Sequence, residues 1–328
     1  MKKNLCKVLL GIAMITSLTS CNKNESTDNS AFTPTKTINW TITSSPGGGS
    51  DIFTRKISDI MTQEDLVNGQ TIIVANKTDG SGEVGRNEIA RLTKDADYNL
   101  LTFNSGDLMP MVINTKNRIE NFRPIALMAV DKQLIFKGVN TQYESFVDAI
   151  TAAKVGEKII IGGSKGDDVA TYEAMIAEIG LTSEQLTYVT YDSSGDAITA
   201  ALGGHIEFVI SKPAAASEYV DAGSLIPVLA LSTERYTGNL SNAPILSEIG
   251  DYKDVEVPVW RSVVAPAEMS DAAVEYWSSV LGKVSETESW NNDYIDTYKL
   301  MPNYLDAHAT TEYITNYQIE FIEENGIE

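Results

Sequence analysis

The chain has 328 residues, with 25 lysines and arginines against 45 aspartates and glutamates, which gives a formal net charge of −20. This acidic balance disfavours binding to nucleic acid and to anionic membranes, because both recruit proteins through a basic surface. The length is sufficient for one or two domains with a substantial buried core.

The first twenty residues predict an export signal. Three lysines flank the start of an apolar run at residues 8–18 that is too short to span a bilayer. The sequence Leu18-Thr19-Ser20-Cys21 is typical of a lipobox, in which the cysteine is acylated and becomes the new N-terminus. An ordinary secretory signal with an incidental cysteine is the alternative, but its cleavage site favours an A-x-A pattern.

We therefore expect residues 1–20 to be a lipoprotein signal peptide and Cys21 to be lipidated. The protein would work outside the cytoplasm, anchored to the cell membrane or to an outer membrane facing the periplasm. The other cysteine, Cys6, lies in the signal peptide, so no disulfide is available. Residues 21–36 are mostly polar without apolar periodicity and are expected to form a flexible tether, with the folded part beginning near Thr37.

Strand and helix patterns alternate through the first two thirds of the remaining chain, which is typical of parallel βαβ units. The expected strands are residues 37–44, 70–76, 100–104, 158–162, 186–191 and 206–211. Two longer β-like stretches, 122–137 and 225–232, fit no single unit and are expected to cross between two lobes. Residues 271–328 predict helices that return to cover the first lobe. The expected boundaries are 37–129 and 227–328 for lobe 1, and 130–226 for lobe 2.

A glycine-rich loop directly follows the first expected strand, with the sequence Ser44-Ser45-Pro46-Gly47-Gly48-Gly49-Ser50-Asp51. Glycines let the backbone approach a ligand closely, and the N–H groups and dipole of a following helix favour an anion such as a carboxylate or phosphate. The alternative is a capped turn in which Ser50 or Asp51 satisfies those N–H groups. No Gly-Lys-Ser/Thr sequence follows, so the loop is not a P-loop.

A second loop, Gly80-Ser81-Gly82-Glu83-Val84-Gly85, matches the G-x-G-x-x-G pattern of dinucleotide-binding folds. The match starts four residues beyond the expected end of a strand at Asn76, rather than in a tight strand-to-helix turn. An exported protein also meets little NAD. A glycine-rich turn into a helix is therefore the favoured interpretation.

A third loop, Gly162-Gly163-Ser164-Lys165-Gly166, matches the G-x-S-x-G nucleophile elbow. A serine hydrolase would use Ser164 as the nucleophile and needs a later histidine, for which the chain offers only His205 and His308. His205 follows two glycines at a turn, and His308 lies among acidic helices. The opposing interpretation is a second anion cradle that faces the first loop from the other lobe.

Metal and cofactor sites have little support in the sequence. Two isolated histidines leave only carboxylates as ligands, and those are scattered as on any solvated acidic surface. Asp167 and Asp168 are the one local pair, and acids in the first turn of a helix usually stabilise it and do nothing more. We expect no metal and no cofactor.

The spacing of several motifs resembles the substrate-binding receptors of tripartite tricarboxylate transporters, also called the Bug or TctC family. The resemblance spans nearly all of the expected domain. It rests on 46–51, Val74 with Asn76, Gly82 and Gly85, 122–126, Tyr191 with Ser194 and Gly195, 202–207, and 243–250.

The resemblance implies an α/β, two-lobed periplasmic-binding-protein fold of type II, in which each lobe is a mainly parallel sheet flanked by helices. Such receptors are not enzymes. They close like a hinge on a small carboxylate, held largely by backbone amides and waters, and deliver it to the permease subunits of the transporter. We expect a monomer. A serine hydrolase, and a receptor reused as a sensor, stay as alternatives.

Transfer of the family pattern onto this chain predicts the ligand-binding residues. They are Ser44, Ser45, Gly47, Gly48, Ser50, Asp51, Asn104, Ser105, Ser164, Gly166, Asp167, Asp168, Tyr172, Tyr191, Ser194 and Asp196. The chain departs from the pattern where it has Asp167, Asp168 and Tyr172 in place of Asn, Gly and His, and Asp192 in place of a basic residue. These changes add negative charge or remove donors. We therefore expect a monocarboxylate, a dicarboxylate or an amino acid, and expect citrate to be repelled.

Overall fold

The computed structural model describes residues 31–327. The expected signal peptide, Cys21 and most of the expected tether lie outside these residues. The end of the expected tether packs on the domain: the Phe32 ring lies 5.4 Å from the Tyr98 ring in an edge-to-face contact, and Lys36 pairs with Asp95. Contacts with the domain therefore begin before Thr37. Within the described residues, no helix is long and apolar enough to span a membrane.

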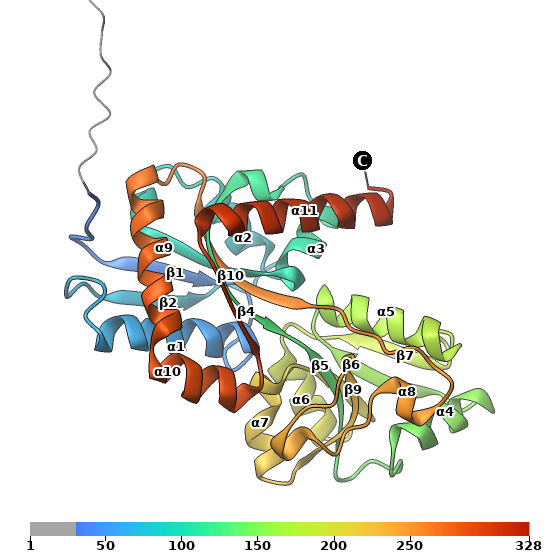
Figure 1. Cartoon of the computed structure of the whole chain (residues 1–328). Coiled ribbons are helices and arrows are strands. Elements are labelled where there is room, and N and C mark those ends of the chain that lie inside the picture. Colours follow the sequence, from blue (N-terminus) through green and yellow to red (C-terminus); the bar gives the residue numbers. More distant parts are fainter. Residues whose placement is uncertain (1–30, 328) are drawn as a thin grey trace, which may run out of the picture. The chain divides into compact units, whose positions relative to one another are not determined.

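The first lobe is built on a six-stranded sheet with the order β11-β4-β10-β3-β1-β2 (Figure 1). Its strands are β1 (Ile38–Ile42), β2 (Ile72–Asn76), β3 (Asn99–Asn104), β4 (Phe122–Asp131), β10 (Val259–Pro266) and β11 (Met301–Leu305). Strand β1 runs parallel to β2 and β3, whereas β10 and β11 run antiparallel to their neighbours. Consecutive β3 residues point to opposite faces, so Leu100 and Leu101 belong to two separate apolar cores.

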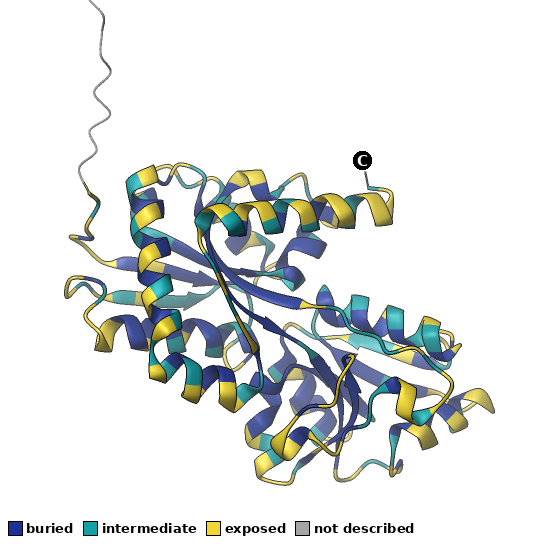
Figure 2. Ribbon diagram, in the orientation of Figure 1, coloured by how far each residue is buried: buried dark blue, intermediate teal, exposed yellow. Residues whose placement is uncertain are grey.

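Helices cover both faces of this sheet (Figure 2). One face packs against α1 (Gly49–Gln63), α9 (Asp271–Glu286), α10 (Glu288–Trp290) and the π-helix η4 (Asn291–Asp296). The other face packs against α2 (Glu83–Ala90), α3 (Ser105–Asn114) and α11 (Ala307–Asn325). Large buried aromatic residues contribute to both cores, among them Trp40 and Trp277 in the first and Phe103 and Trp260 in the second. Short 3₁₀ turns η1 (Ala96–Tyr98) and η2 (Ile119–Asn121) precede β3 and β4.

The second lobe is built on a five-stranded sheet with the order β7-β6-β8-β5-β9. Its strands are β5 (Gln133–Gly138), β6 (Ile159–Gly163), β7 (Leu186–Thr190), β8 (Phe208–Ser211) and β9 (Leu225–Leu231). One face packs against α4 (Phe146–Lys154), α5 (Asp167–Ile179) and the short α8 (Leu246–Ile249). The other packs against α6 (Ser194–Leu202), α7 (Pro213–Asp221) and the 3₁₀ turn η3 (Gly238–Leu240).

The chain crosses between the sheets twice. The first crossing confirms the expectation for residues 122–137, because β4 belongs to one sheet and β5 to the other, with only Lys132 between them. The second crossing lies later than the expected boundary at 226/227. Strand β9 pairs along its length with β5, and Leu246 and Val255 still pack on the second lobe. The chain returns to the first sheet only at β10.

The α/β class with two helix-flanked sheets is confirmed. Each sheet is mixed in strand direction, because the strands next to the crossings pair antiparallel with their neighbours. Helices α9 and α11 do return to the first lobe, as expected for residues 271–328. Strand β11 interrupts this helical region and adds an edge to the first sheet, which the sequence patterns did not predict.

Candidate functional site

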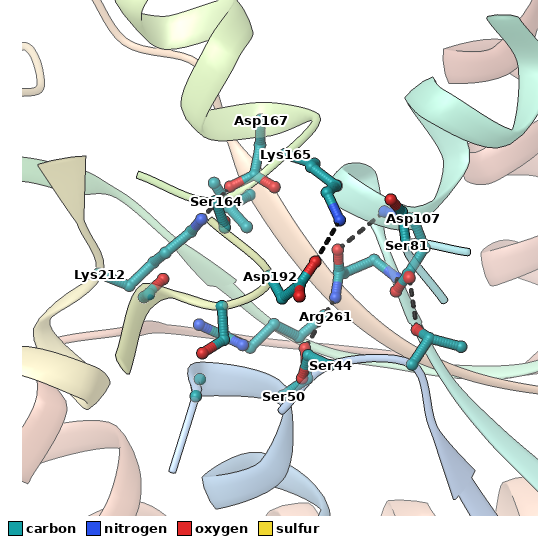
Figure 3. Close-up of a pocket in the computed structure, with 18 of the residues that line it drawn as sticks. Ser44, Ser50, Ser81, Asp107, Ser164, Lys165, Asp167, Asp192, Lys212 and Arg261 are labelled. Carbon is teal, nitrogen blue, oxygen red and sulfur yellow. Dashed lines mark hydrogen bonds and ion pairs between the residues drawn. The ribbon is translucent and has the colours of Figure 1, made fainter. Parts of the chain in front are cut away.

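The candidate site is a pocket of about 70 Å³ between the two lobes, lined by loops that lead from strands into helices (Figure 3). That volume suits a small solute or a few water molecules. Five helices begin at the pocket, namely α1 and α3 from the first lobe and α5, α6 and α7 from the second. The lining residues are Thr43, Ser44, Gly48, Gly49, Ser50, Ser81, Arg86, Asn104, Gly106, Asp107, Ser164, Lys165, Asp167, Asp192, Ser193, Ser194, Lys212, Val259 and Arg261.

The glycine-rich loop before α1 is fixed by Asp51, which lies behind the pocket. Its carboxylate accepts hydrogen bonds from the Gly47 amide, from Arg55 and from Asn76, each at 3.0 Å. Burial raises the pKa of Asp51, but these donors outweigh it and lower the pKa below its usual value. The residue that precedes the helix is Gly48, and no side chain caps the helix there. The first-turn amides of α1 therefore face the pocket without a side-chain acceptor at the cap position.

The start of α3 is held by a reciprocal cap. The Asn104 side chain accepts a hydrogen bond from the Asp107 amide at 3.1 Å, and Asp107 accepts one from the Asn104 amide at 3.2 Å. The Asn104 amide group also donates to the Ser50 hydroxyl at 3.0 Å, which links the starts of α1 and α3. Ser105, expected to contact ligand, is instead fully buried beneath this turn.

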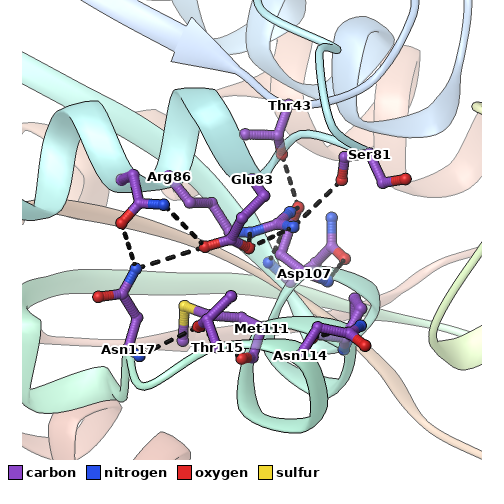
Figure 4. Close-up of polar contacts among 12 residues, drawn as sticks. Thr43, Ser81, Glu83, Arg86, Asp107, Met111, Asn114, Thr115 and Asn117 are labelled. Carbon is purple, nitrogen blue, oxygen red and sulfur yellow. Dashed lines mark hydrogen bonds and ion pairs between the residues drawn. The ribbon is translucent and has the colours of Figure 1, made fainter.

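Arg86, which lines the pocket, ties α2 to α3 (Figure 4). Only 2% of its surface is exposed. It donates to Asp107 at 2.8 Å and to Glu83 at 3.0 Å, and Asp107 also accepts a hydrogen bond from Thr43 at 2.6 Å. The G-x-G-x-x-G glycines serve this packing: a Cβ at Gly82, which has a φ of +82°, would lie 2.6 Å from the Thr43 carbonyl oxygen. These contacts support the interpretation as a turn into a helix.

Lys212 organises the second-lobe side of the pocket. This buried lysine lies between β8 and α7 and forms ion pairs with both Asp167 and Asp168. Asp168 in turn accepts hydrogen bonds from the Ser164 amide at 2.6 Å and from the Ser164 hydroxyl at 2.7 Å. Burial raises the pKa of Asp167 above its usual value, against the opposing effect of Lys212, and the neighbouring Asp168 adds to the rise.

These contacts bear on the hydrolase alternative. The Ser164 hydroxyl donates to Asp168, a carboxylate that is itself paired with Lys212, and not to a histidine. His205 and His308 are both exposed, and neither lines the pocket. The geometry therefore gives no support to a serine nucleophile at this site. Across the part of the chain that the structure describes, no group of three or more His, Cys, Asp or Glu side chains is arranged to hold a metal ion.

The remaining loop of the second lobe contributes an ion pair and a helix cap. Lys165 donates to Asp192 at 2.7 Å, and both side chains are partly accessible at the pocket. Ser193 caps α6 by accepting from the Asp196 amide at 3.2 Å, and its hydroxyl donates to the Asp196 carboxylate at 2.8 Å. Asp196 therefore faces its own helix rather than the pocket.

The structure divides the predicted ligand-binding residues into two groups. Those that line the pocket are Ser44, Gly48, Ser50, Asn104, Ser164, Asp167 and Ser194. Those that lie outside its lining are Ser45, Gly47, Asp51, Ser105, Gly166, Asp168, Tyr172, Tyr191 and Asp196. Several of the second group support the lining residues, as Asp51 and Asp168 do. Tyr172 is buried beneath α5 and donates to the Leu186 carbonyl.

The residues predicted from the sequence include none of the four cations of the pocket, and they also omit Asp107. Lys212 follows an apolar strand directly and precedes a helix that begins with proline, which is the same kind of junction as the three loops above. Arg261 interrupts the apolar strand β10, and a charge inside such a strand is itself a signal because it needs a buried partner. That partner is Asp131 at the end of β4. Burial raises the pKa of Asp131 although Arg261 opposes the rise.

The two lobes touch at a contact between glycines. Gly106 in the first turn of α3 lies against Gly166, which precedes α5 and has a φ of +64°. A Cβ on Gly166 would lie 2.5 Å from the Gly106 Cα, and a Cβ on Gly106 would lie 2.0 Å from an oxygen of Asp167. Only residues without side chains allow the two helix starts to approach this closely.

Two helix-flanked α/β lobes, joined by two crossings and with a polar pocket between them, define the class of periplasmic binding proteins. Within that class, residues 54–320 match the model of the tripartite tricarboxylate transporter family receptor. The chain belongs to this family of solute-binding receptors.

Relatives of known sequence or structure are distant. BugT of Bordetella pertussis (strain Tohama I) is 24% identical over 242 residues, which cover 71% of each chain. MatC of Rhodopseudomonas palustris, solved with bound malate, is 15% identical with a TM-score of 0.73, over 88% of this chain and 99% of that one. An R. palustris protein solved with adipate is 18% identical with a TM-score of 0.77, over 90% of this chain and 98% of that one. At these identities the two solved structures support the fold alone.

Proposed function

We propose that the protein is an extracytoplasmic receptor that captures a small carboxylate between its two lobes and delivers it to the permease of a tripartite tricarboxylate transporter. The observation that carries this proposal is the convergence of five helix N-termini from both lobes on one small pocket. Their N–H groups and dipoles favour an anion, and their placement on both lobes lets one ligand bridge them. The receptor binds its ligand without chemical conversion.

The charges of the pocket favour a ligand with one or two carboxylates, or an amino acid. Each cation at the pocket already faces a carboxylate. The pairs are Arg86 with Asp107, Lys165 with Asp192, Lys212 with Asp167, and Arg261 with Asp131. No surplus of positive charge is therefore available for the three carboxylates of citrate. The malate and adipate found in two structurally similar proteins have the size and charge that this pocket suits.

Isothermal titration calorimetry on the purified protein tests the proposal. The panel contains malate, succinate, adipate, aspartate, glutamate, nicotinate and citrate. We expect at least one of the first six to bind and citrate to bind weakly or not at all. Ser164→Ala should weaken binding, because the hydroxyl helps to fix Asp168 and the loop before α5, and should change no esterase rate. A protein that binds no carboxylate, or that loses a hydrolytic activity in this variant, contradicts the proposal.

We also propose that Cys21 carries a lipid anchor. The lipobox pattern and the apolar run before it support this assignment. Because the segment around Phe32 packs on the first lobe, the anchor would hold that lobe and keep the receptor near a permease in the same membrane. Radiolabelled palmitate should label the wild type and not Cys21→Ala, and equal labelling of both proteins refutes the anchor.

A further inference from the structure

Arg261 is a buried cation with an unused donor at the pocket. It lies on β10, lines the pocket, and exposes only 3% of its surface. One terminal nitrogen of its guanidinium, Nη2, donates to Asp131. Its Nε is also buried and has no hydrogen-bond partner among the described residues. A buried N–H group without an acceptor is unfavourable, so the site favours an acceptor that the protein itself does not supply.

The guanidinium of Arg261 lies against the first residue of α1. A Cβ at Gly49 would lie 2.7 Å from Nη2 and 3.1 Å from Nη1, so only glycine leaves room for the guanidinium there. The preceding residue, Gly48, provides no side-chain cap for the helix. Two positive ends therefore meet at one point of the pocket, the guanidinium and the N-terminus of a fifteen-residue helix.

The carboxylates nearest to this point are already held by other groups of the protein. Asp51, in the first turn of α1, is occupied by Gly47, Arg55 and Asn76. Asp131 accepts from Nη2, and Nε has no partner in the part of the chain that the structure describes. Among the described residues, Asp131 is therefore the one carboxylate hydrogen-bonded to this guanidinium, which also lies against the uncapped N-terminus of α1, and Asp167 acts on the guanidinium only through its charge.

The other cations of the pocket are either paired with two carboxylates or more accessible than Arg261. Lys212 is paired with two carboxylates, and Arg86 is paired with both Glu83 and Asp107. Lys165 is more accessible and is paired with Asp192. Arg261 is the pocket cation that combines near-complete burial, one carboxylate partner and an unpartnered N–H group.

We propose that Arg261 selects a charged ligand over a neutral one. It does so by holding one carboxylate group of the ligand against the first turn of α1. The carboxylate accepts from the Arg261 guanidinium and from backbone amides of α1, and a neutral amide in the same place lacks the charge that both groups favour. This inference rests on the proposed function and deepens it, because it names the residue and the side of the pocket that select an anion.

The test compares carboxylates with their neutral diamides by calorimetry. The probes are succinate, malate and adipate, each paired with its diamide. We expect Arg261→Gln to weaken carboxylate binding by about 10- to 100-fold, the range for hydrogen bonds to charged groups. The preference of the wild type for carboxylate over diamide should shrink by a similar factor, because the remaining helix N-terminus is a weaker source of positive charge.

Removing Arg261 leaves Asp131 buried without its partner, so a second variant guards against loss of folding. The double variant Arg261→Gln with Asp131→Asn removes both charges and should fold while showing the same loss of affinity and selectivity. The matched control is Arg123→Gln, which breaks a more exposed arginine–aspartate pair with Asp271 on the same lobe and should bind like the wild type.

The outcomes separate this inference from the proposed function. If the wild type binds a carboxylate, and both the single and the double variant keep its affinity and its selectivity, the role of Arg261 is refuted while the receptor function stands. If the wild type binds none of the three acids and none of the other acids in the panel above, the receptor function is refuted and the role of Arg261 fails with it.

Discussion

At the scale of single residues, Gly106 shows how the two lobes come together. It lies in the first turn of α3, and its nearest neighbours across the pocket are Gly166 and Asp167 from the second lobe. Lys212 and Gln133 both hold Asp167, so its carboxylate cannot easily move aside. A side chain at position 106 must therefore either displace this buried ion pair or keep the lobes apart.

Gly106→Ala should accordingly weaken ligand binding without loss of the folded protein. A Cβ there would lie 2.0 Å from an Asp167 oxygen, and overpacking of this kind costs about 1–3 kcal/mol, or roughly 5- to 150-fold in affinity. Calorimetry with the tightest-binding carboxylate measures the effect. Gly195→Ala is the matched control, because its Cβ would lie 3.6 Å from the nearest atom, an ordinary contact. Equal affinity of the two variants contradicts the view that the ligand is held with the lobes in this contact.

At the scale of elements, the junctions between strands and helices were predictable. The alternation of apolar strands and helix faces predicted β1, β2, β3, β6, β7 and β8 to within a few residues. Within each sheet, parallel strands carry their carboxyl ends to the same edge, which places Ser44 near Asn104 and Ser164 near Ser194. The resemblance implied that the loops of the two lobes face each other, and the structure brings these four residues to one pocket.

The details within each junction were not predictable from the loop sequences. Successive residues in the first turn of a helix point about 100° apart, so one of two neighbours faces the pocket while the other faces inward. Ser50 and Asp167 line the pocket, whereas Asp51 and Asp168 lie behind it. Which member faces the ligand depends on how the helix is rotated against its sheet, and that depends on distant core residues.

Long-range pairing explains the other failures. Arg261 and Asp131 are 130 residues apart in sequence, and their strands become neighbours only because the chain crosses to the second lobe and back. Strand β9 has an apolar sequence that suits either sheet, and its pairing with β5 places it in the second. A local sequence pattern does not indicate which residue pairs with Arg261 or which sheet β9 joins.

At the scale of the whole molecule, the floor of the pocket lies where the two lobes are joined. Asp131 ends the strand just before the first crossing at Lys132, and Arg261 lies two residues after β10 begins at the end of the second crossing. A ligand held by Arg261 would therefore rest on both connections, while the helix N-termini of the two lobes contact it from either side. Such an arrangement would link the proposed ligand capture to closure of one lobe on the other.

The most direct test of the account is a crystal structure of the protein with the tightest-binding carboxylate of the panel. The account predicts a ligand in the pocket between the lobes, with one carboxylate within hydrogen-bonding distance of Arg261 and the first turn of α1. The same ligand should also contact the start of α5 or α6 in the second lobe. A ligand bound to one lobe alone, or in the separate groove lined by Lys132, Tyr236 and Met301, would contradict the account.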